Sequence, residues 1–311
     1  MAPTNSPYIF ESGVDGDLLH EVFQTFKGYL LNSLGQNERW TQKVQVSDLL
    51  PTRGNEAKVK LASLGYGVHE WVDERIKSKI RHYDYTVLVK RWANAIRLKV
   101  DDLEDEDLNL GQYKTLISGM AQDFEEHKHQ QFIDLLLAGF GSTLGTCFDG
   151  QFYFDSDHPL DDGSTQSNVA DLAFADTALY TAIKQMEKMK KHNGLYANVS
   201  PTHIIAPVAL RSAVEAVLDK KTVANGSDNP LYKRVAPIFD PRIDATSETA
   251  WFLLDANQAL KPFFSVDRKG ITADMDVSTQ FEDGHVSWGY NARYNASFGF
   301  YQVMWGTDGV P

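Results

Sequence analysis

Between residues 54 and 100 the sequence alternates polar and apolar residues in a way that suits a long two-stranded ribbon. The alternation runs through Lys58–Leu61, Tyr85–Lys90 and Ala95–Val100. A period of two is typical of a strand with one face covered and the other in water. A lone hairpin is only marginally stable in water. We therefore expect this ribbon to have no folding partner within its own chain and to take one from an adjacent copy.

The ribbon is basic, and an acidic run follows it directly. The cations are Lys58, Lys60, Lys77, Lys79, Lys90, Arg91, Arg97 and Lys99. In the run Asp101–Asp107 only Leu103 is not acidic. The carboxylates could interact favourably with the dipole at the N-terminus of a following helix, and the cations could simply be solvated. Alternatively, the ribbon of one copy meets the acidic run of the next, with contacts expected at Lys58, Lys60, Trp71, Arg75, Lys77, Lys90, Arg91, Arg97, Asp101, Asp102, Glu104 and Asp105.

Periodicity predicts helices and strands in separate parts of the chain. Apolar residues recur at helical spacing in residues 18–30, 108–138, 172–186 and 207–218, the second of these a rod of about 45 Å. The third helix is expected to carry Lys188–His192 in its last turn, where cations suit the helix dipole. Strands are predicted at residues 202–206, 251–254, 286–294 and 297–304, with a hairpin turn at Glu282–Gly284. This pattern indicates an α+β fold.

Composition limits the classes of function. The 311 residues correspond to roughly two domains. A net charge of −12 argues against a protein that wraps nucleic acid or binds an anionic membrane. The longest apolar run, Ile204–Leu210, is too short to span a bilayer. The single cysteine, Cys147, excludes an intrachain disulfide, and we expect it to be a small buried hydrophobe.

The densest polar cluster is Asp155-Ser156-Asp157-His158-Pro159. Two carboxylates and an imidazole so close together could hold a divalent metal, and Asp155, Asp157 and His158 would then serve a metal-dependent hydrolase. Asp and Ser side chains also bond to their own backbone in tight turns. Because a metal site normally draws its ligands from separate elements, we favour an ordered turn.

Other candidate residues favour structural roles. His127 and His129 lie two apart on the long helix, so they point to different faces and are expected to be solvated. His203, within an apolar strand, is expected to be a satisfied core histidine. The glycines of Gly139–Gly145 follow a helix rather than a strand, which excludes a dinucleotide loop. The sequence therefore predicts no active site, no metal and no cofactor.

Six groups of residues, in order along most of the chain, resemble segments of the Mu-like prophage major head subunits. They are His69–Arg75, Tyr85–Val87 with Asp102–Tyr113, Phe152–Pro159, Pro201–Leu210, Trp251–Asp255 with Lys261–Pro262, and Tyr290–Ala296. The sequence departs from the family at Val72–Asp73, where the family has a glycine.

This resemblance implies the α+β fold of tailed-phage major capsid proteins, the Hong Kong 97 type. It implies an N-terminal arm over residues 1–53 and an extended E-loop over residues 54–100. A peripheral domain with a long spine helix would occupy residues 101–169. An axial domain would occupy residues 170–264, and residues 265–311 would return to the peripheral sheet.

The same resemblance implies a structural protein that assembles into hexamers and pentamers of an icosahedral head around double-stranded DNA. The E-loop of one copy would lie across its neighbour. Expected partners are other copies, a portal, scaffold or decoration proteins, and packaged DNA through weak nonspecific contact. The chain would assemble in the host bacterial cytoplasm and end in the virion. A cellular nanocompartment shell of the same fold is an alternative. No lysine is expected to crosslink to Asn291 or Asn295.

Overall fold

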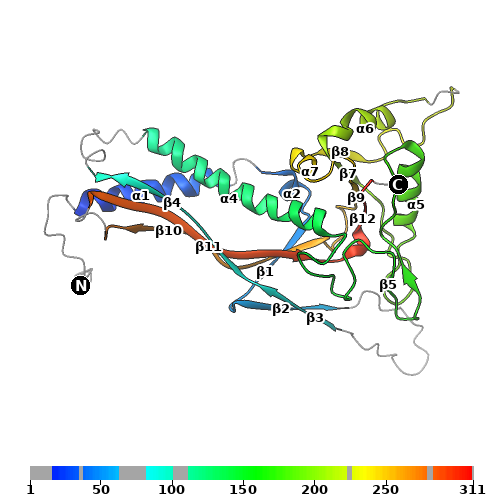
Figure 1. Ribbon diagram of the computed structural model, residues 1–311, viewed down its shortest axis with the longest axis horizontal. Helices are drawn as coiled ribbons and strands as arrows, with labels where there is room; N and C mark the ends of the chain where they lie inside the picture. The colour runs from blue at the N-terminus through cyan, green and yellow to red at the C-terminus, as the bar shows by residue number, and fades with distance from the viewer. Residues whose placement is uncertain are drawn as a thin grey trace, which may run out of the picture. The chain divides into compact units, whose positions relative to one another are not determined.

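The computed structural model describes residues 16–34, 38–62, 82–100, 111–222, 226–278 and 283–309. The chain divides into two compact units, each built from three separate stretches of sequence. Unit 1 comprises residues 1–39, 90–128 and 269–294, and unit 2 comprises residues 40–89, 129–268 and 295–311. Helix α4 (Gly111–Ala138) and strands β10 (Phe263–Asp276) and β11 (His285–Phe298) each contribute residues to both units (Figure 1).

Unit 1 packs helices on one face of a sheet. Helix α1 (Gly16–Ser33) and the first half of α4 cover strand β11 and strand β4 (Lys90–Lys99). Four regularly spaced residues of α1, namely Leu19, Val22, Phe26 and Leu30, are buried in this core. The Phe26 ring meets Trp288 edge to face, with ring centroids 5.6 Å apart. The predicted helix over residues 18–30 is thereby confirmed.

Strand β4 corrects the prediction that the whole ribbon lacks a partner in its own chain. It pairs antiparallel with β11 over its full length, from Lys90 opposite Tyr294 to Lys99 opposite His285. The sheet order is β1-β10-β11-β4, where β1 is Ser47–Pro51. Alternation in a sequence shows that a strand has one covered face, but it does not show which strand lies beside it. The partner of β4 comes from almost 200 residues further along the chain.

The rest of the ribbon forms a hairpin in unit 2. Strands β2 (Glu56–Ala62) and β3 (His82–Leu88) pair antiparallel, with Glu56 opposite Leu88. The hairpin also has a partner in its own chain, because Ala57 and Val87 are buried in the main core of unit 2. Strand β1 (Ser47–Pro51) pairs in parallel with the start of β10 in the same unit. Residues 63–81, between the two hairpin strands, lie outside the described residues.

A second sheet of unit 2 has the order β12-β9-β7-β8. Its strands are β7 (His203–Ala206), β8 (Ala236–Phe239), β9 (Trp251–Leu254) and β12 (Met304–Thr307). Helices α5 (Asp176–Glu187) and α6 (Arg211–Leu218) pack on it around the buried Trp251 and Trp305. Shorter elements complete the unit: α2 (Trp40–Lys43), β5 (His158–Pro159), β6 (Thr165–Gln166), η1 (Val208–Leu210), α7 (Pro241–Asp244) and η2 (Tyr301–Val303).

Several element boundaries differ from the sequence predictions. The helix predicted over residues 207–218 is the 3-10 turn η1 followed by α6, which begins at Arg211. The helix predicted from residue 172 begins at Asp176, and the strand predicted over residues 286–294 extends to Phe298. Helix α5 ends at Glu187, so Lys188–His192 follows the helix instead of forming its last turn. Residues 297–304 are not one strand, because β11 ends at Phe298 and the chain turns at Gly299 into η2. A Cβ at Gly299 would lie 2.6 Å from the carbonyl oxygen of Lys261, so this turn depends on a close approach of two backbones. None of the described helices is long and apolar enough to cross a membrane.

Candidate functional site

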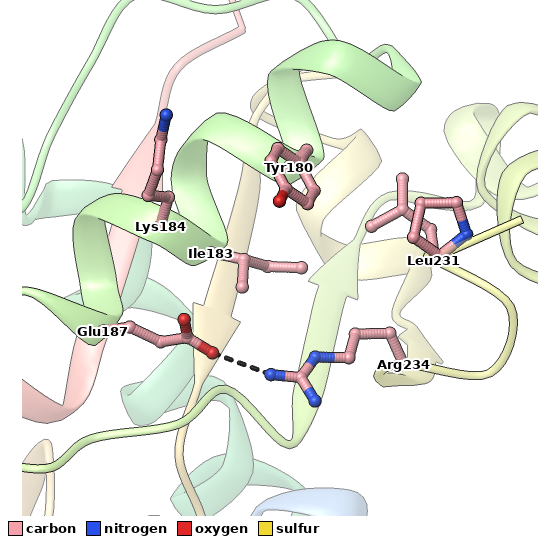
Figure 2. A pocket seen from close by; sticks show the side chains of 7 residues that line it. Tyr180, Ile183, Lys184, Glu187, Leu231 and Arg234 are labelled. Carbon is pink, nitrogen blue, oxygen red and sulfur yellow. Dashed lines mark hydrogen bonds and ion pairs between the residues drawn. The ribbon is translucent and has the colours of Figure 1, made fainter.

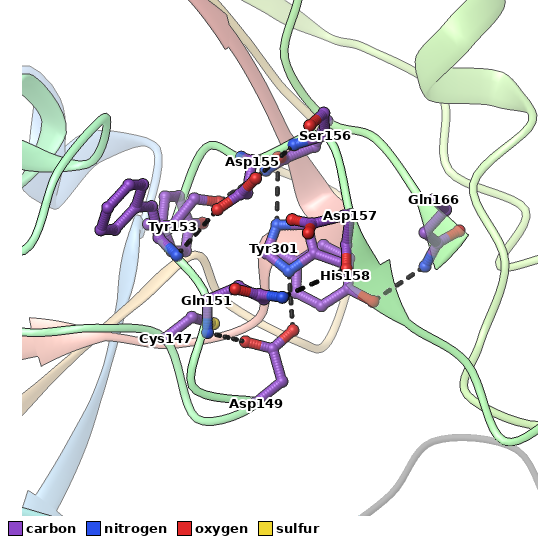
Figure 3. A network of polar contacts seen from close by, with 12 residues as sticks. Cys147, Asp149, Gln151, Tyr153, Asp155, Ser156, Asp157, His158, Gln166 and Tyr301 are labelled. Carbon is purple, nitrogen blue, oxygen red and sulfur yellow. Dashed lines mark hydrogen bonds and ion pairs between the residues drawn. The ribbon is translucent and has the colours of Figure 1, made fainter. Parts of the chain in front are cut away.

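The acidic turn at residues 155–159 is built around a fully buried histidine. Nδ1 of His158 lies 2.6 Å from Oδ2 of Asp149, and Nε2 lies 3.2 Å from Oδ1 of Asn168. The imidazole stacks on the ring of Tyr301 at 3.6 Å between centroids, with an interplanar angle of 6°. Figure 3 shows Asp149 and Tyr301 beside the ring of His158. Both ring nitrogens therefore already have protein partners.

The two acidic residues of the turn serve its backbone. Asp155 accepts hydrogen bonds from the backbone N–H groups of Ser156 at 2.6 Å and of Phe152 at 3.1 Å. Asp157 is exposed, and its pKa is raised because it shares a hydrogen bond with Asp155. The predicted ordered turn is confirmed. Among the described residues no group of three or more His, Cys, Asp and Glu side chains is placed to hold a metal.

A second buried histidine ties helix α4 to two short helices of unit 2. Nε2 of His129 donates to Oδ2 of Asp240 at 2.7 Å, and Nδ1 lies 3.0 Å from Oγ1 of Thr41. Asp240 also accepts from Nε1 of Trp40 at 2.7 Å. A hydroxyl, an imidazole and a carboxylate in series resemble a hydrolytic triad. All three residues are buried at 3% exposure or less, so a substrate has no access to this hydroxyl.

The prediction of a solvated histidine pair on the long helix is therefore wrong. His129 is buried, and His127 is half-buried with its ring 4.1 Å from that of Trp92. Nδ1 of His127 lies 2.8 Å from the hydroxyl of Tyr294. The two imidazoles do point to different faces, as their spacing predicted. Polar residues of α4 therefore pack against other elements of the fold. The periodicity of α4 alone could not show which of its residues those elements cover.

The loop after α5 holds a third buried histidine, which the sequence prediction placed on a helix end. His192 is 1% exposed, and neither ring nitrogen has a hydrogen-bond partner within the described ranges. It contacts Tyr83 of strand β3 and Phe148, each with ring centroids at 5.5 Å. Burial lowers the pKa of His192, and the negative charges of Asp149 and Asp161 offset part of that effect. His192 is thus a neutral ring in an aromatic cluster.

Cys147 and His203 were both expected in the core. Cys147 is 2% exposed, and burial raises the pKa of its thiol, so the prediction of a small buried hydrophobe is confirmed. His203 lies in strand β7 as predicted but is half-buried, and its Nδ1 lies 2.8 Å from Oγ1 of Thr202.

The residues that line a surface groove in unit 2 also do not form a catalytic arrangement. It has a volume of about 260 Å³ and lies between α5 and the turn at Pro230–Arg234. Figure 2 shows Tyr180, Ile183 and Leu231 along it. Its only carboxylate, Glu187, is paired with Arg234 at 2.7 Å, and both side chains are exposed. An acid–base group in such a site is neutralised and hydrated, so the groove does not indicate catalysis.

The predicted contact residues fall into three groups. Lys58 is exposed on the hairpin strand β2, which also contains Lys60. Lys90, Arg91 and Arg97 are exposed on β4, where Arg97 pairs with Asp283. Trp71, Arg75, Lys77, Asp101, Asp102, Glu104 and Asp105 lie outside the described residues.

The contact residues predicted from the sequence did not include two acidic residues on the exposed side of unit 1. Asp274 and Asp276 alternate on β10 with the partly buried Ala273 and Met275, and the partly buried Val277 follows the strand. This alternation of acidic and apolar residues in the sequence could have predicted a strand with an acidic, exposed face.

Several solved structures with this fold are chains of capsids or virus-like particles. A procapsid chain of bacteriophage JBD30 matches with a TM-score of 0.58 and 19% identity, over 94% of this chain and 76% of that one. The mature capsid of bacteriophage PhiM1 matches with a TM-score of 0.54 and 9% identity, over 97% and 91%. A virus-like particle from Pyrococcus furiosus gives 0.53 and 10%, over 92% and 99%. The expected α+β fold of phage major capsid proteins, the Hong Kong 97 type, is confirmed.

The model of the Mu-like prophage major head subunit gpT family matches residues 19–181, 170–243 and 240–309. The chain belongs to this family. A Mu-like prophage major head subunit of Haemophilus influenzae is 25% identical over 247 residues, 78% of this chain and 58% of the relative. The major capsid protein of Escherichia phage Mu is 22% identical over 240 residues, 75% and 55%. The chain thus spans little more than half the length of these curated relatives, and neither is named as an enzyme.

Proposed function

We propose that this chain is a structural capsid subunit that assembles, as hexamers and pentamers, into an icosahedral phage head around double-stranded DNA. The observation that carries the proposal is the head-subunit family match, which runs from residue 19 to residue 309. The closed polar clusters around His158 and His129 support it, because their reactive groups bond one another and are shielded from solvent.

The domain roles are part of this proposal. Residues 1–53 are the N-terminal arm and residues 54–100 the E-loop region. Residues 101–169 and 265–311 form the peripheral domain, with α4 as its spine helix, and residues 170–264 form the axial domain. The hairpin β2–β3 and the 28-residue helix α4 support these roles, as does the sheet β12-β9-β7-β8 with its helices.

Assembly needs contacts that repeat from copy to copy. Head-to-tail contacts close into rings when the rotation between copies is a fifth or a sixth of a turn. Obligate assemblies bury on the order of several thousand Å² in such contacts. We propose that the basic ribbon meets acidic groups of the next copy, including the run Asp101–Asp107. Such charges fix the register of a contact more than they add affinity.

Other partners follow from the same role. A head subunit meets a portal and either scaffold or decoration proteins. Contact with packaged DNA is weak and nonspecific, because a chain with a net charge of −12 repels phosphates on average. The subunit assembles in the cytoplasm of the bacterial host and becomes part of the virion.

Negative-stain microscopy and sedimentation velocity of the purified full chain test the proposal. The expected result is rings or closed shells of uniform size whose amount rises with protein concentration. A compact monomer that persists at high concentration, with no particles on the grid, would contradict a capsid role. A small oligomer of fixed size with metal-dependent hydrolytic activity would support the enzyme alternative instead.

A further inference from the structure

Strand β3 packs against the buried His192 close to where the strand begins. The rings of Tyr83 and His192 have centroids 5.5 Å apart, and Phe148 at 5.5 Å and Tyr301 at 6.3 Å complete an aromatic enclosure around the imidazole. Neither Nδ1 nor Nε2 of His192 has a hydrogen-bond partner among the residues that the structure describes. A charged imidazole would be buried there without an acceptor, which costs far more than the burial of a neutral ring. The enclosure therefore suits the neutral form of His192.

The two ends of the β2–β3 hairpin are held in different ways. At one end Ala57 and Val87 are buried in the core of unit 2, and the nearby hydroxyl of Tyr85 donates to the carbonyl oxygen of Thr146 at 3.0 Å. At the other end Tyr83 lies opposite Leu61, and its ring is only partly buried against the core. A two-stranded hairpin is marginally stable by itself in water. Strand pairing at Tyr83 therefore depends on the contact of this ring with the aromatic enclosure.

Titratable groups surround His192 from several elements of unit 2. Burial is the largest influence and lowers the pKa of His192, while the carboxylates of Asp161 and Asp149 raise it in part. The nearby imidazole of His158 lowers it further, and His158 is itself paired with Asp149 at 2.6 Å. The groups that face the ring are Tyr83 of β3, Asp149 after α4, His158 of β5, Asp161 after β5 and Tyr301 of η2. Both phenols are neutral near pH 7, because the pKa of a tyrosine is ordinarily about 10 and burial raises that of Tyr301.

Asp161 provides a favourable place for a charged imidazole outside the enclosure. Its backbone N–H donates to the carbonyl oxygen of His192 at 2.9 Å, so the two residues are adjacent although they lie far apart in the sequence. Asp161 is exposed to water. A histidine side chain that leaves the enclosure on this side enters water beside a carboxylate, and both surroundings favour the protonated ring. The neutral and the protonated forms of His192 thus prefer different positions.

We infer that His192 is an acid-sensitive switch for the hairpin: the neutral ring holds β3 at Tyr83, and the protonated ring moves out toward Asp161 and lets this end of the hairpin open. The end at Ala57 and Val87 stays in the core, so the opening is local. The closed form is favoured above pH 6.5, the ordinary value for histidine, and loses this advantage as the pH falls through the lower folded-state pKa. The inference goes beyond the proposed function, because it concerns the folded subunit and does not require assembly.

Hydrogen–deuterium exchange of the full chain at pH 8 and pH 5 tests the switch, with protection factors corrected for the intrinsic pH dependence of exchange. Protection at Tyr83 is expected to fall about fivefold or more at pH 5, while that of strand β7 stays unchanged. His192→Phe fills the enclosure with a ring that takes up no proton, so its protection at Tyr83 should be equal at both pH values. No fall in the wild type, or the same fall in His192→Phe, would overturn the inference. A simultaneous loss in β7 would also overturn it, because unit 2 would then be unfolding as a whole.

Asp161→Asn provides a second test that leaves the enclosure intact. It removes a charge that raises the pKa of His192, so the hairpin should open at a lower pH than in the wild type. A titration of the His192 ring by nuclear magnetic resonance should show the same downward shift. The matched control is His203→Gln, which removes a half-buried histidine of β7 whose pKa is also lowered by burial, and it should open as the wild type does. An unchanged opening pH in Asp161→Asn, or loss of the response in His203→Gln, would overturn the inference.

Discussion

The hydroxyl of Tyr85 on strand β3 lies 2.8 Å from that of Ser297 at the end of strand β11. Tyr85 also donates a hydrogen bond to the carbonyl oxygen of Thr146 at 3.0 Å. Burial raises the pKa of this phenol, as expected for a hydroxyl that leaves water for a packed interior. The hairpin is therefore tied into the core of its own subunit before any neighbour binds.

Tyr85→Phe tests this anchor. The substitution leaves the ring in place but removes both hydrogen bonds, so we expect the free energy of unfolding to fall by about 1–3 kcal/mol. We also expect faster amide exchange in β3, measured by hydrogen–deuterium exchange. Thr86→Ser, on the exposed side of the same strand, is the control. Unchanged exchange in Tyr85→Phe would show that apolar packing alone holds the hairpin.

The pair Asp149–His158 is expected to stabilise the turn at residues 155–159. Removal of one partner from a buried pair leaves an unpaired polar group, at a cost of about 3–5 kcal/mol. Asp149→Ala and His158→Ala should each lower the urea midpoint strongly, and the double variant should cost less than their sum. Asp162→Asn, at an exposed turn, is the control. Addition of zinc or magnesium should leave the thermal midpoint of the wild type unchanged; an increase would revive the metal alternative.

Stability should fall with acidity because of His192. Burial lowers its folded-state pKa below the ordinary value of 6.5, so the unfolded chain binds a proton more readily. The stabilisation is present above pH 6.5 and is lost as the pH falls from there through the folded-state pKa. His192→Phe should reduce the difference between the urea midpoints at pH 5 and pH 8. His20→Gln, on the exposed side of α1, should not. Equal pH dependence in His192→Phe and wild type would contradict this role.

Gly289→Ala should destabilise unit 1. The added Cβ would lie 2.5 Å from the carbonyl oxygen of Asn94 and 2.8 Å from the Cβ of Ala95, so β4 and β11 must move apart. Forced shifts of this kind cost about 1–3 kcal/mol. The matched control is Gly270→Ala on β10, where a Cβ meets no atom within 4 Å. Equal thermal midpoints for the two variants would show that the sheet tolerates the extra atom.

We expect no covalent crosslinks between copies. Nζ of Lys269 donates to Oδ1 of Asn291 at 3.1 Å, but this lysine is exposed to water. A lysine ammonium has three N–H donors and no lone pair with which to attack an amide carbon. Boiled particles should therefore run as a single monomer band on a denaturing gel. A ladder of higher bands would contradict this prediction, and Asn291→Asp and Asn295→Asp would then locate the acceptor.

The sequence by itself determined the elements whose evidence is local. The spacing of Leu19, Val22, Phe26 and Leu30 predicted helix α1, because one turn of a helix involves only neighbouring residues. The turn at Asp155 was predictable for the same reason, since short polar side chains bond to adjacent backbone groups. Alternation likewise predicted β4 as a strand. The order of the family segments along the chain predicted the fold class.

Only the tertiary structure decided which surfaces are covered. It placed β11 beside β4, buried His129 against Asp240, and enclosed His192 among aromatic rings. It also brought Asp274 of β10 beside the small residues of β4 and β11. Each of these relationships joins residues far apart in the sequence, and local periodicity carries no information about such partners. Burial and pairing between distant segments follow from the packing of the whole chain, because that packing decides which faces exclude water.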